Sequence, residues 1–512
     1  MLVHEILEYT TARLPSKVAL IEGTRRMTFA QTLSQVEALS ARLARSGVSR
    51  GDRVALLFPN CIEFCVAYFA VLRLGAIVVP LNNRLAPREF AYVMNDCSPG
   101  TLILGYQFWD TFHEFKQDLK RAPELIYAGE KPKKGVAFFA ELVGHPSQGV
   151  PPSAKLDPDE PACIMYTSGT TGLPKGAVMS HRNIFINARN AGAHMGYRER
   201  DVTLIVVPLF HVTGLNTQLV AFIYVGGTSV IMRVYNTSGM IELLARHQVT
   251  TMITVPTMFN LMLINPSLKQ ADLSALRALS YGGAPMDPQT ITALQQRLGV
   301  ELFNAYGLTE TSSLTTCMPA CDTVRKGSSV GLAVSGVQLR VVDETGRDLP
   351  PNAVGELWVK GPNVVQTYWN KPEATAQNLA DGWLRTGDYA RIDDEGFVYI
   401  VDRKKDMINR GGENIYSIEV EGAILAHPKV LECAVVARPH SIFGEVVHAF
   451  VVPAPGQEPT EDEIIEHCRK YIAGYKVPAS VSFLEELPRN PGGKVLKTQL
   501  RELVPSGDPP RR

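Results

Sequence analysis

The sequence predicts an α/β protein with a large N-terminal domain of stacked αβ sheets, a β-rich subdomain and a small, mobile α+β C-terminal domain. Short apolar runs alternate with amphipathic segments between residues 53 and 256, hairpin-connected strands begin near residue 325, and a compact α+β pattern follows Asp402. The length of 512 residues also exceeds what one hydrophobic core usually organises, so more than one domain is expected.

The first part of the chain is expected to hold parallel sheets covered by helices on both faces. Strands buried on both faces read as continuous apolar runs, and such runs occur here at residues 53–58, 101–105, 162–166, 202–208, 228–232 and 250–256. The most hydrophobic stretch, residues 64–81, carries Arg73 and Gly75 near its middle. We therefore interpret it as a buried helix that ends near the glycine and continues as a strand, and not as a membrane span.

The domain boundary is expected near residues 402–405. Residues 1–402 would form the large domain, with the β-rich subdomain at about 325–402 and turns at Gly346 and Gly396, and residues 403–512 the small domain. In the small domain the pattern predicts helices at 418–428 and 461–472 and strands at 431–439, 446–454 and 481–487.

Composition excludes some partners and suggests a compartment. Lys plus Arg and Asp plus Glu are equal at 51 each, which gives no support for a nucleic-acid partner. The eight cysteines are scattered, without metal-ligand spacing, as in a reduced cytoplasmic protein. The N-terminus has no apolar core of a secretory signal, so we expect a cytoplasmic chain with at most peripheral membrane contact.

The segment YTSGTTGLPKG at residues 166–176 is the most distinctive local feature. Its glycines and Pro174 exclude a helix or a core strand, while backbone N–H groups, hydroxyls and Lys175 suit a polyphosphate. The pattern matches neither a Walker A loop nor a nucleophile elbow. A flexible surface loop is the alternative that these residues alone leave open.

Six more motifs follow this loop in order. They are PLFHVTGL (208–215), YGGAPM (281–286), NAYGLTET (304–311), GWLRTGD (382–388), VDRKKDMINRGGENIY (401–416) and PRNPGGKVLK (488–497). Together with residues 166–183 they resemble the adenylate-forming superfamily over nearly the whole chain. That superfamily includes acyl-CoA synthetases, aryl-CoA ligases, luciferases and peptide-synthetase adenylation domains, and the resemblance is strongest to bacterial AMP-forming fatty-acyl-CoA synthetases.

The resemblance implies an AMP-forming carboxylic acid:CoA ligase that uses ATP and Mg²⁺, with coenzyme A as co-substrate. Thr309 would bind the α-phosphate, Glu310 would hold Mg²⁺, and Lys494 would be the catalytic lysine between the carboxylate and the α-phosphate. The nucleotide would further contact Thr167, Ser168, Gly169, Thr170, Thr171, Lys175, Gly283, Ala284, Pro285, Asn304, Ala305, Tyr306, Gly307, Asp388 and Arg403.

The resemblance also implies a rotation of the small domain between two half-reactions. Lys405 would be the hinge, and the loop of Gly411, Gly412 and Glu413 would admit CoA. A solvated basic turn at Lys404 and Lys405 is the alternative.

The acid is expected to carry an uncharged tail. The expected acyl pocket consists of Phe210, His211 as a gate and catalytic residue, Tyr281, Gly282, Gly307 and Ser312. No Lys or Arg occurs at 202–232, 278–296 or 298–324. The second carboxylate of a substrate such as malonate would therefore be buried in this pocket without a cationic partner. We expect a medium- or long-chain fatty acid, with an aryl acid of the cinnamate or benzoate type as the alternative. We leave open transfer to a carrier protein and a homodimer. The intact catalytic positions disfavour a non-catalytic binding protein.

Overall fold

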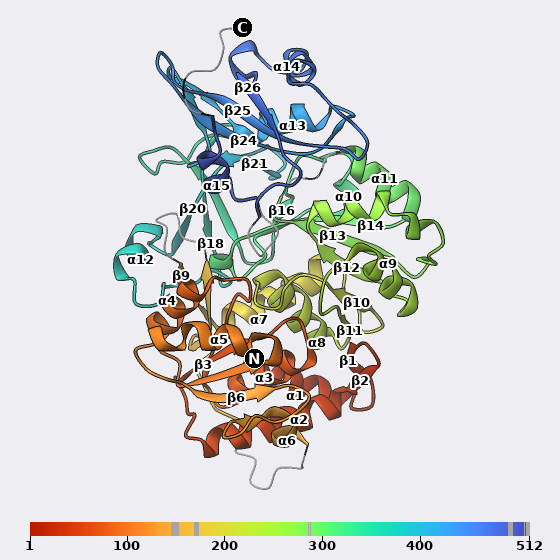
Figure 1. Ribbon diagram of the computed structural model, residues 1–512, viewed down its shortest axis with the longest axis vertical. Helices are drawn as coiled ribbons and strands as arrows, with labels where there is room; N and C mark the ends of the chain where they lie inside the picture. Colours follow the sequence, from red (N-terminus) through yellow and green to blue (C-terminus); the bar gives the residue numbers. More distant parts are fainter. Residues whose placement is uncertain are drawn as a thin grey trace.

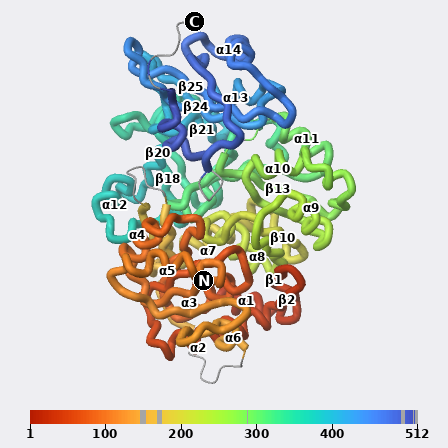
Figure 2. Tube along the Cα trace, in the orientation of Figure 1, coloured from red at the N-terminus to blue at the C-terminus, as the bar shows by residue number. Residues whose placement is uncertain are grey.

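The computed structural model describes residues 1–144, 153–167, 174–284, 286, 288–489, 495–505 and 507. Within these residues the strands form four sheets. The first elements of the chain, coloured red and orange, and the C-terminal strands and helices, coloured blue, lie at opposite ends of the molecule (Figures 1 and 2).

One largely parallel sheet is built from the N-terminal third of the chain, in the order β7-β6-β5-β3-β4-β8-β9. Only its last pair, β8 and β9, is antiparallel among the described pairs of this sheet. The strands are β3 (Arg53–Leu57), β4 (Ile77–Pro80), β5 (Thr101–Gly105), β6 (Glu124–Ala128), β7 (Ala137–Phe138), β8 (Pro161–Thr167) and β9 (Lys175–Ser180). The runs predicted at 53–58, 101–105 and 162–166 are therefore confirmed as strands.

A second sheet has the order β16-β15-β14-β13-β12-β10-β11-β1-β2 and is parallel from β14 to β1. Its predicted members are confirmed as β10, β11 and β12. The strands are β1 (Val18–Glu22), β2 (Arg25–Thr28), β10 (Val202–Ile205), β11 (Thr228–Ile231), β12 (Thr251–Thr254), β13 (Ala278–Gly282), β14 (Glu301–Tyr306), β15 (Thr316–Cys317) and β16 (Leu332–Ala333).

Helices cover both parallel sheets. Helix α3 is buried along its length, ends at Arg73 beside Glu8, and is followed by Gly75 with φ of +71° and then β4, as predicted. The other helices of this part are α1 (Val3–Arg13), α2 (Phe29–Arg45), α4 (Pro87–Cys97), α5 (Trp109–Phe115), α6 (Phe139–Val143), α7 (His181–His194), α8 (Ala221–Val225), α9 (Thr237–Arg246), α10 (Pro256–Ile264) and α11 (Pro288–Leu298); α3 itself is Ile62–Arg73.

Several short helices join these elements. One of them, η3 (Thr213–Val220), is a π-helix that runs directly into α8. The remainder are 3₁₀ turns: η1 (Tyr106–Phe108), η2 (Lys116–Asp118), η4 (Pro266–Lys269), η5 (Thr309–Thr311), η6 (Ala320–Asp322) and η7 (Gly474–Lys476). None of the described helices combines the length and the apolar character that a bilayer crossing requires.

The β-rich part is an antiparallel sheet, as its hairpin pattern predicts. Gly346 and Gly396 have φ of +83° and +86°, which explains glycine at the two predicted turns. The elements are β17 (Gln338–Val342), β18 (Gly355–Lys360), α12 (Pro372–Asn378), β19 (Leu379–Ala380), β20 (Trp383–Ile392) and β21 (Val398–Arg403).

The C-terminal part has its own sheet, in the order β23-β22-β25-β24, with β26 beside β25. The predicted helices and strands of this part are confirmed. Its elements are β22 (Ile408–Arg410), β23 (Glu413–Ile415), α13 (Ser417–Leu425), β24 (Val430–His440), β25 (Gly444–Pro453), α14 (Glu461–Arg469), β26 (Ser480–Phe483) and α15 (Lys497–Glu502). The change of sheet between β21 and β22 falls beside the expected boundary at 402–405, which stays a prediction.

Candidate active site

A cavity of about 960 Å³ lies where the two parallel sheets, the β-rich part and the C-terminal part meet. Many of its lining residues stand at the carboxyl end of a parallel strand or directly after it; the strands are β4, β8, β12, β13 and β14. That edge is where open α/β sheets bind ligands, because the loops there diverge and leave a crevice. The C-terminal part contributes one wall of the cavity through residues 403–405, 489, 496 and 499.

The two arms of the glycine-rich loop border this cavity. Thr167 and Lys175 are register partners at the ends of β8 and β9, and both line the cavity. The Nζ of Lys175 lies 5.8 Å from the ring centre of Tyr368, close enough for a cation–π contact. Ser168, Gly169, Thr170 and Thr171 lie outside the described residues.

Glu310 is held by a tyrosine from a distant segment. The Tyr368 hydroxyl donates to Oε1 of Glu310 at 2.9 Å. The backbone N–H of the next residue, Trp369, donates to the carbonyl of Gly176 at 2.7 Å and so joins this segment to β9. Burial, followed by the charge of Glu310, raises the pKa of Tyr368, so its hydroxyl stays a donor. One carboxylate that faces a cavity beside the glycine-rich segment fits Mg²⁺, which proteins commonly hold through one or two carboxylates together with substrate phosphates.

The turn that carries Thr309 and Glu310 is strained and tightly packed. A Cβ on Gly307 would lie 1.4 Å from the carbonyl oxygen of Ser313, so only glycine fits. Ser312 and Ser313 have φ of +56° and +120°, which non-glycine residues adopt only where the surroundings enforce it.

Three buried amides enforce that turn. Asn216 of η3 donates to the Ser312 carbonyl at 3.1 Å, and Asn363 donates to the Leu314 carbonyl at 2.8 Å. Asn187 of α7 accepts from the Leu314 N–H at 2.8 Å. Segments far apart in the sequence thus fix where Thr309 and Glu310 face the cavity.

A second tyrosine orients Asp388. The Tyr306 hydroxyl donates to Oδ2 of Asp388 at 2.6 Å, while Arg403, the register partner of Asp388, places its Nε 3.6 Å from Oδ1. Burial and then the charge of Asp388 raise the pKa of Tyr306. Asp388 therefore lies at the wall as an oriented acceptor, suitable for sugar hydroxyls.

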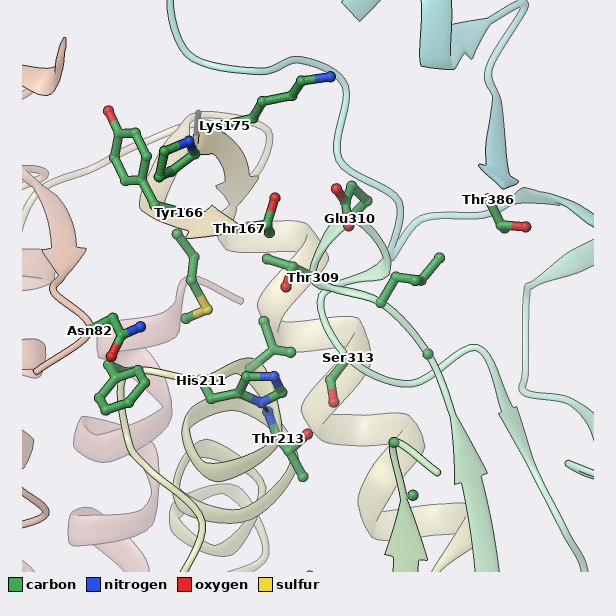
Figure 3. A pocket seen from close by; sticks show the side chains of 18 of the residues that line it. Asn82, Tyr166, Thr167, Lys175, His211, Thr213, Thr309, Glu310, Ser313 and Thr386 are labelled. Atoms are coloured by element: carbon green, nitrogen blue, oxygen red, sulfur yellow. Dashed lines mark hydrogen bonds between the residues drawn. The ribbon is translucent and has the colours of Figure 1, made fainter. Parts of the chain in front are cut away.

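Opposite the glycine-rich loop, the cavity has a side without lysine or arginine. We call it the acid side and define it by the lining residues at 207–217, 253–255, 282–283, 305–308 and 313–314. Among these described residues none is Lys or Arg. Figure 3 shows Lys175 and Thr167 on one side of Thr309 and Glu310, and His211, Thr213 and Ser313 on the other. The His211 Nδ1 accepts from the Thr213 N–H at 3.3 Å.

Models of two protein families match the chain. The model described as AMP-binding enzyme matches residues 7–369, and the model described as AMP-binding enzyme C-terminal domain matches residues 419–494. The chain belongs to the AMP-binding enzyme family.

Full-length relatives agree with this assignment. An indoleacetate–CoA ligase of Aromatoleum aromaticum is 37% identical over 490 residues, which cover 96% of this chain and 96% of that protein. A long-chain-fatty-acid–CoA ligase of Yersinia pestis is 36% identical over 530 residues, which cover 97% of this chain and 93% of that protein. The crystal structure of an anthranilate CoA ligase with anthranoyl-AMP matches with a TM-score of 0.93 at 28% identity, covering 98% of this chain and 97% of that one. The predicted superfamily, α/β fold class and enzyme class are confirmed.

Several residues expected at the site of this AMP-binding enzyme do not reach the cavity wall. Tyr281 is buried in the core, the Asn304 amide donates to the Ser329 carbonyl at 2.9 Å, and Ser312 is buried within the strained turn. Ala284 is exposed outside the cavity, and Pro285 lies outside the described residues. Of the other expected residues, Phe210, His211, Gly282, Gly283, Ala305, Tyr306, Gly307, Thr309, Glu310, Asp388, Arg403 and Lys405 line the cavity.

The small-domain residues divide between the cavity and the surface. Lys494 lies outside the described residues, but Arg489 and Leu496 on either side of it line the cavity. Gly411, Gly412 and Glu413 are exposed at the β22–β23 hairpin and do not line it.

Helix α15, which follows Lys494, is bonded to the expected hinge. Arg501 pairs with Asp406 at 2.6 Å and donates to the Lys405 carbonyl at 3.2 Å. Lys497 donates to the Ser417 hydroxyl at 2.6 Å and pairs with Glu421 at 2.7 Å. Ser417 also donates to Asp402, whose pKa burial raises to about 6. Helix α15 is thus tied to the residues around Lys405.

Sequence reasoning missed Tyr368 and the three asparagines. Tyr368 gave no signal, since its partner Glu310 lies 58 residues away. Asn187 and Asn216 stand within helical segments that are buried in the core. Buried amides need partners, so an asparagine on the apolar face of a predicted helix was a usable signal.

Proposed function

We propose that this protein joins ATP to a carboxylic acid with an uncharged tail and then passes the acyl group to the thiol of CoA. The observation that carries the proposal is the division of one cavity. Lys175, Glu310 and Asp388 surround its nucleotide part, while the acid side has no Lys or Arg among its described residues.

In the first half-reaction a carboxylate oxygen of the acid bonds to the α-phosphorus of ATP, and the bond from that phosphorus to the bridging oxygen breaks. The products are an acyl-adenylate and pyrophosphate. Lys175 would offset charge on the phosphates, Thr309 would donate to the α-phosphate, and Asp388 would accept from the ribose hydroxyls. Bound through Glu310, Mg²⁺ would neutralise phosphate charge.

In the second half-reaction the CoA thiol gives up its proton, its sulfur bonds to the acyl carbon, and the bond from that carbon to the phosphate oxygen breaks, so that AMP leaves. Arg489 and Leu496 line the cavity and the 411–413 hairpin does not, an arrangement that suits the first half-reaction. We propose that residues 403–512 rotate as a domain about Lys405, exchanging the Lys494 segment for the hairpin. Arg501 and Lys497 would carry α15 along with the rotating domain.

For the acid, a medium- or long-chain fatty acid is the first candidate and an aryl acid the alternative. A second carboxylate would be buried on the acid side without a cationic partner, which costs several kcal/mol. Two of the relatives are named for indoleacetate and for long-chain fatty acids. Both kinds of acid have an uncharged tail beside the carboxylate. Transfer to a carrier protein is a third candidate. A cytoplasmic location and a homodimer stay predictions.

Acid-dependent pyrophosphate release tests the proposal. The series runs from acetate to palmitate and includes malonate, benzoate and coumarate, each with and without CoA. We expect release with uncharged-tail acids and thioester formation only with CoA. A clear preference for malonate or acetate would overturn the uncharged-tail assignment. Acylation of a carrier protein but not of CoA would favour the third candidate.

A further inference from the structure

A row of hydroxyl side chains lies directly beneath the acid side of the cavity. Ile253 and Gly282 line the cavity near the carboxyl ends of β12 and β13. Side chains two residues apart on a strand point to the same face, so Thr251 and Ser280 lie one step deeper on that face. In the register, Ser280 pairs with Ile253 and Thr251 pairs with Ala278, so Ser280 lies on the same face as Thr251 and one step nearer the cavity.

The row continues across the sheet. Thr203 of β10 is the register partner of both Thr251 and Ser229, so the three side chains are neighbours on one face. We call Thr203, Ser229, Thr251 and Ser280 the hydroxyl layer. All four residues are buried.

Gln218 of η3 covers this layer from the helix side. Its Nε2 donates to the Thr203 hydroxyl at 3.1 Å and to the Leu204 carbonyl at 3.2 Å. Gln218 is completely buried, and its neighbour Thr217 lines the cavity. An acyl tail that extended past Ile253, between η3 and the sheet, would therefore meet Gln218.

The polar atoms here suit an apolar chain poorly. Oε1 of Gln218 and the hydroxyls of Ser229, Thr251 and Ser280 are shielded from solvent and have no hydrogen-bond partner among the described residues. A methylene chain offers such atoms no partner, and displacing Gln218 would also break its two bonds. Water or the amide satisfies this layer better than hydrocarbon does.

We propose that Gln218 and the hydroxyl layer are the length stop of the acid pocket. This inference rests on the proposed function and narrows it to compact tails. The substrate class is then a medium-chain fatty acid or an acid with a single aromatic ring, and long unbranched tails are refused.

Two substitutions of Gln218 separate its volume from its amide. Gln218→Ala removes both, while Gln218→Met keeps a side chain of similar length without hydrogen-bonding groups. For each, kcat/KM is measured from butyrate to palmitate and for phenyl-substituted acids of increasing chain length. Gln296→Ala, an exposed glutamine on α11, is the matched control.

We expect the wild-type protein to lose activity steeply beyond medium length. In Gln218→Ala the ratio of kcat/KM for palmitate to that for octanoate should rise by about 10-fold or more, since one methylene in an apolar pocket changes rates by about 10- to 200-fold. Gln218→Met should show a smaller rise, and the control none.

Two results would overturn the length stop while leaving the proposed function intact. One is a wild-type preference for palmitate, and the other is an unchanged length profile in a folded Gln218→Ala protein that still binds ATP. Should both Gln218 variants fail to fold, Thr203→Val removes the hydroxyl that accepts from Gln218 at nearly constant volume, and an unchanged profile there counts against the stop. Absence of pyrophosphate release with every acid would overturn the proposed function as well.

Discussion

Two tyrosine hydroxyls, from Tyr306 and Tyr368, donate to the carboxylates of Asp388 and Glu310 at the nucleotide part of the cavity. Such partners fix the direction of a carboxylate that must meet a metal or a sugar hydroxyl. The carboxylates were predictable because they stand in recognisable motifs. The tyrosine contacts were not, because only the fold brings Tyr368 to Glu310.

Replacing Tyr368 with phenylalanine removes one hydroxyl and leaves the ring under Lys175. We expect Mg²⁺-dependent ATP binding to weaken by about 10- to 100-fold, the usual effect of losing a partner of a metal-binding carboxylate. Calorimetric titration of ATP at several Mg²⁺ concentrations measures it without turnover.

Tyr399→Phe is the matched control, since the Tyr399 hydroxyl also donates to a carboxylate, that of Asp393, at 3.1 Å but outside the cavity lining. Equal Mg²⁺ dependence in Tyr368→Phe and the wild type would show that the hydroxyl does not position Glu310.

Lys494→Ala should affect the two half-reactions unequally. Loss of a preorganised donor typically costs about 10²- to 10³-fold in rate, and we expect at least that loss in adenylate formation. Thioester formation from supplied acyl-adenylate should stay near the wild-type rate, because the lysine would be withdrawn in that step. Rapid-quench measurement of each half-reaction checks this, and similar losses in both would contradict the assigned role.

At the level of elements, six strands of the two parallel sheets and the helix-to-strand unit at residues 64–81 followed from apolar runs. The π-helix η3 did not, because the period of residues 213–220 does not distinguish a π-helix from an α-helix, whereas the structure shows that Asn216 and Gln218 both reach buried partners. Tyr281, Asn304 and Ser312 were expected at the wall because they stand in motifs. Side-chain direction at the end of a strand depends on packing that the motif does not encode.

Lys405→Pro tests the hinge at this scale. Proline fixes φ but keeps the carbonyl, and the described hydrogen bond of Lys405 is accepted by its carbonyl from Arg501. The position of the C-terminal part seen in this structure should therefore persist in the variant. We expect adenylate formation to be retained and thioester formation to fall, as a stiffened hinge requires. Lys404→Pro is unsuitable as a control, because the Lys404 N–H donates to the Gly387 carbonyl at 2.9 Å. Unimpaired thioester formation in Lys405→Pro would argue against rotation at this residue.

At the scale of the whole molecule, a buried histidine pair joins the N-terminus to helix α7. His4 and His181 lie edge to face with ring centres 5.9 Å apart, and His181 Nδ1 accepts from the Val3 N–H at 3.2 Å. Burial, then the charge of His4, lowers the pKa of His181 to about 3.

This pair should make the fold acid-sensitive. Because the folded pKa of His181 lies below the unfolded value, the unfolded chain binds the proton first as pH falls. The free energy of unfolding is therefore unaffected above about pH 6.5 and decreases below it, by about 1.4 kcal/mol at pH 5.5 for this group. Urea unfolding at pH 7.5 and 5.5 should show a smaller pH effect in His181→Gln than in the wild type. Identical pH effects would exclude His181 as the cause.

The α/β class and the succession of a parallel-sheet part, a β-rich part and an α+β part were predictable because many independent patterns, from apolar runs to turn glycines, agree. The way the C-terminal part closes the cavity was not, since it depends on contacts such as that of Lys404 with Glu356 of β18, which no local pattern signals.

The close approach of Gly307 to Ser313 limits how the acid pocket can change during evolution or in the laboratory. A side chain at 307 would meet backbone and not a side chain that can move, so this position of the cavity wall must stay glycine. New acid preferences must arise through positions farther along the tail, such as Gln218. A mutant library aimed at other substrates should keep Gly307 unchanged and vary residues of η3 and of the strands β10, β12 and β13 that face it.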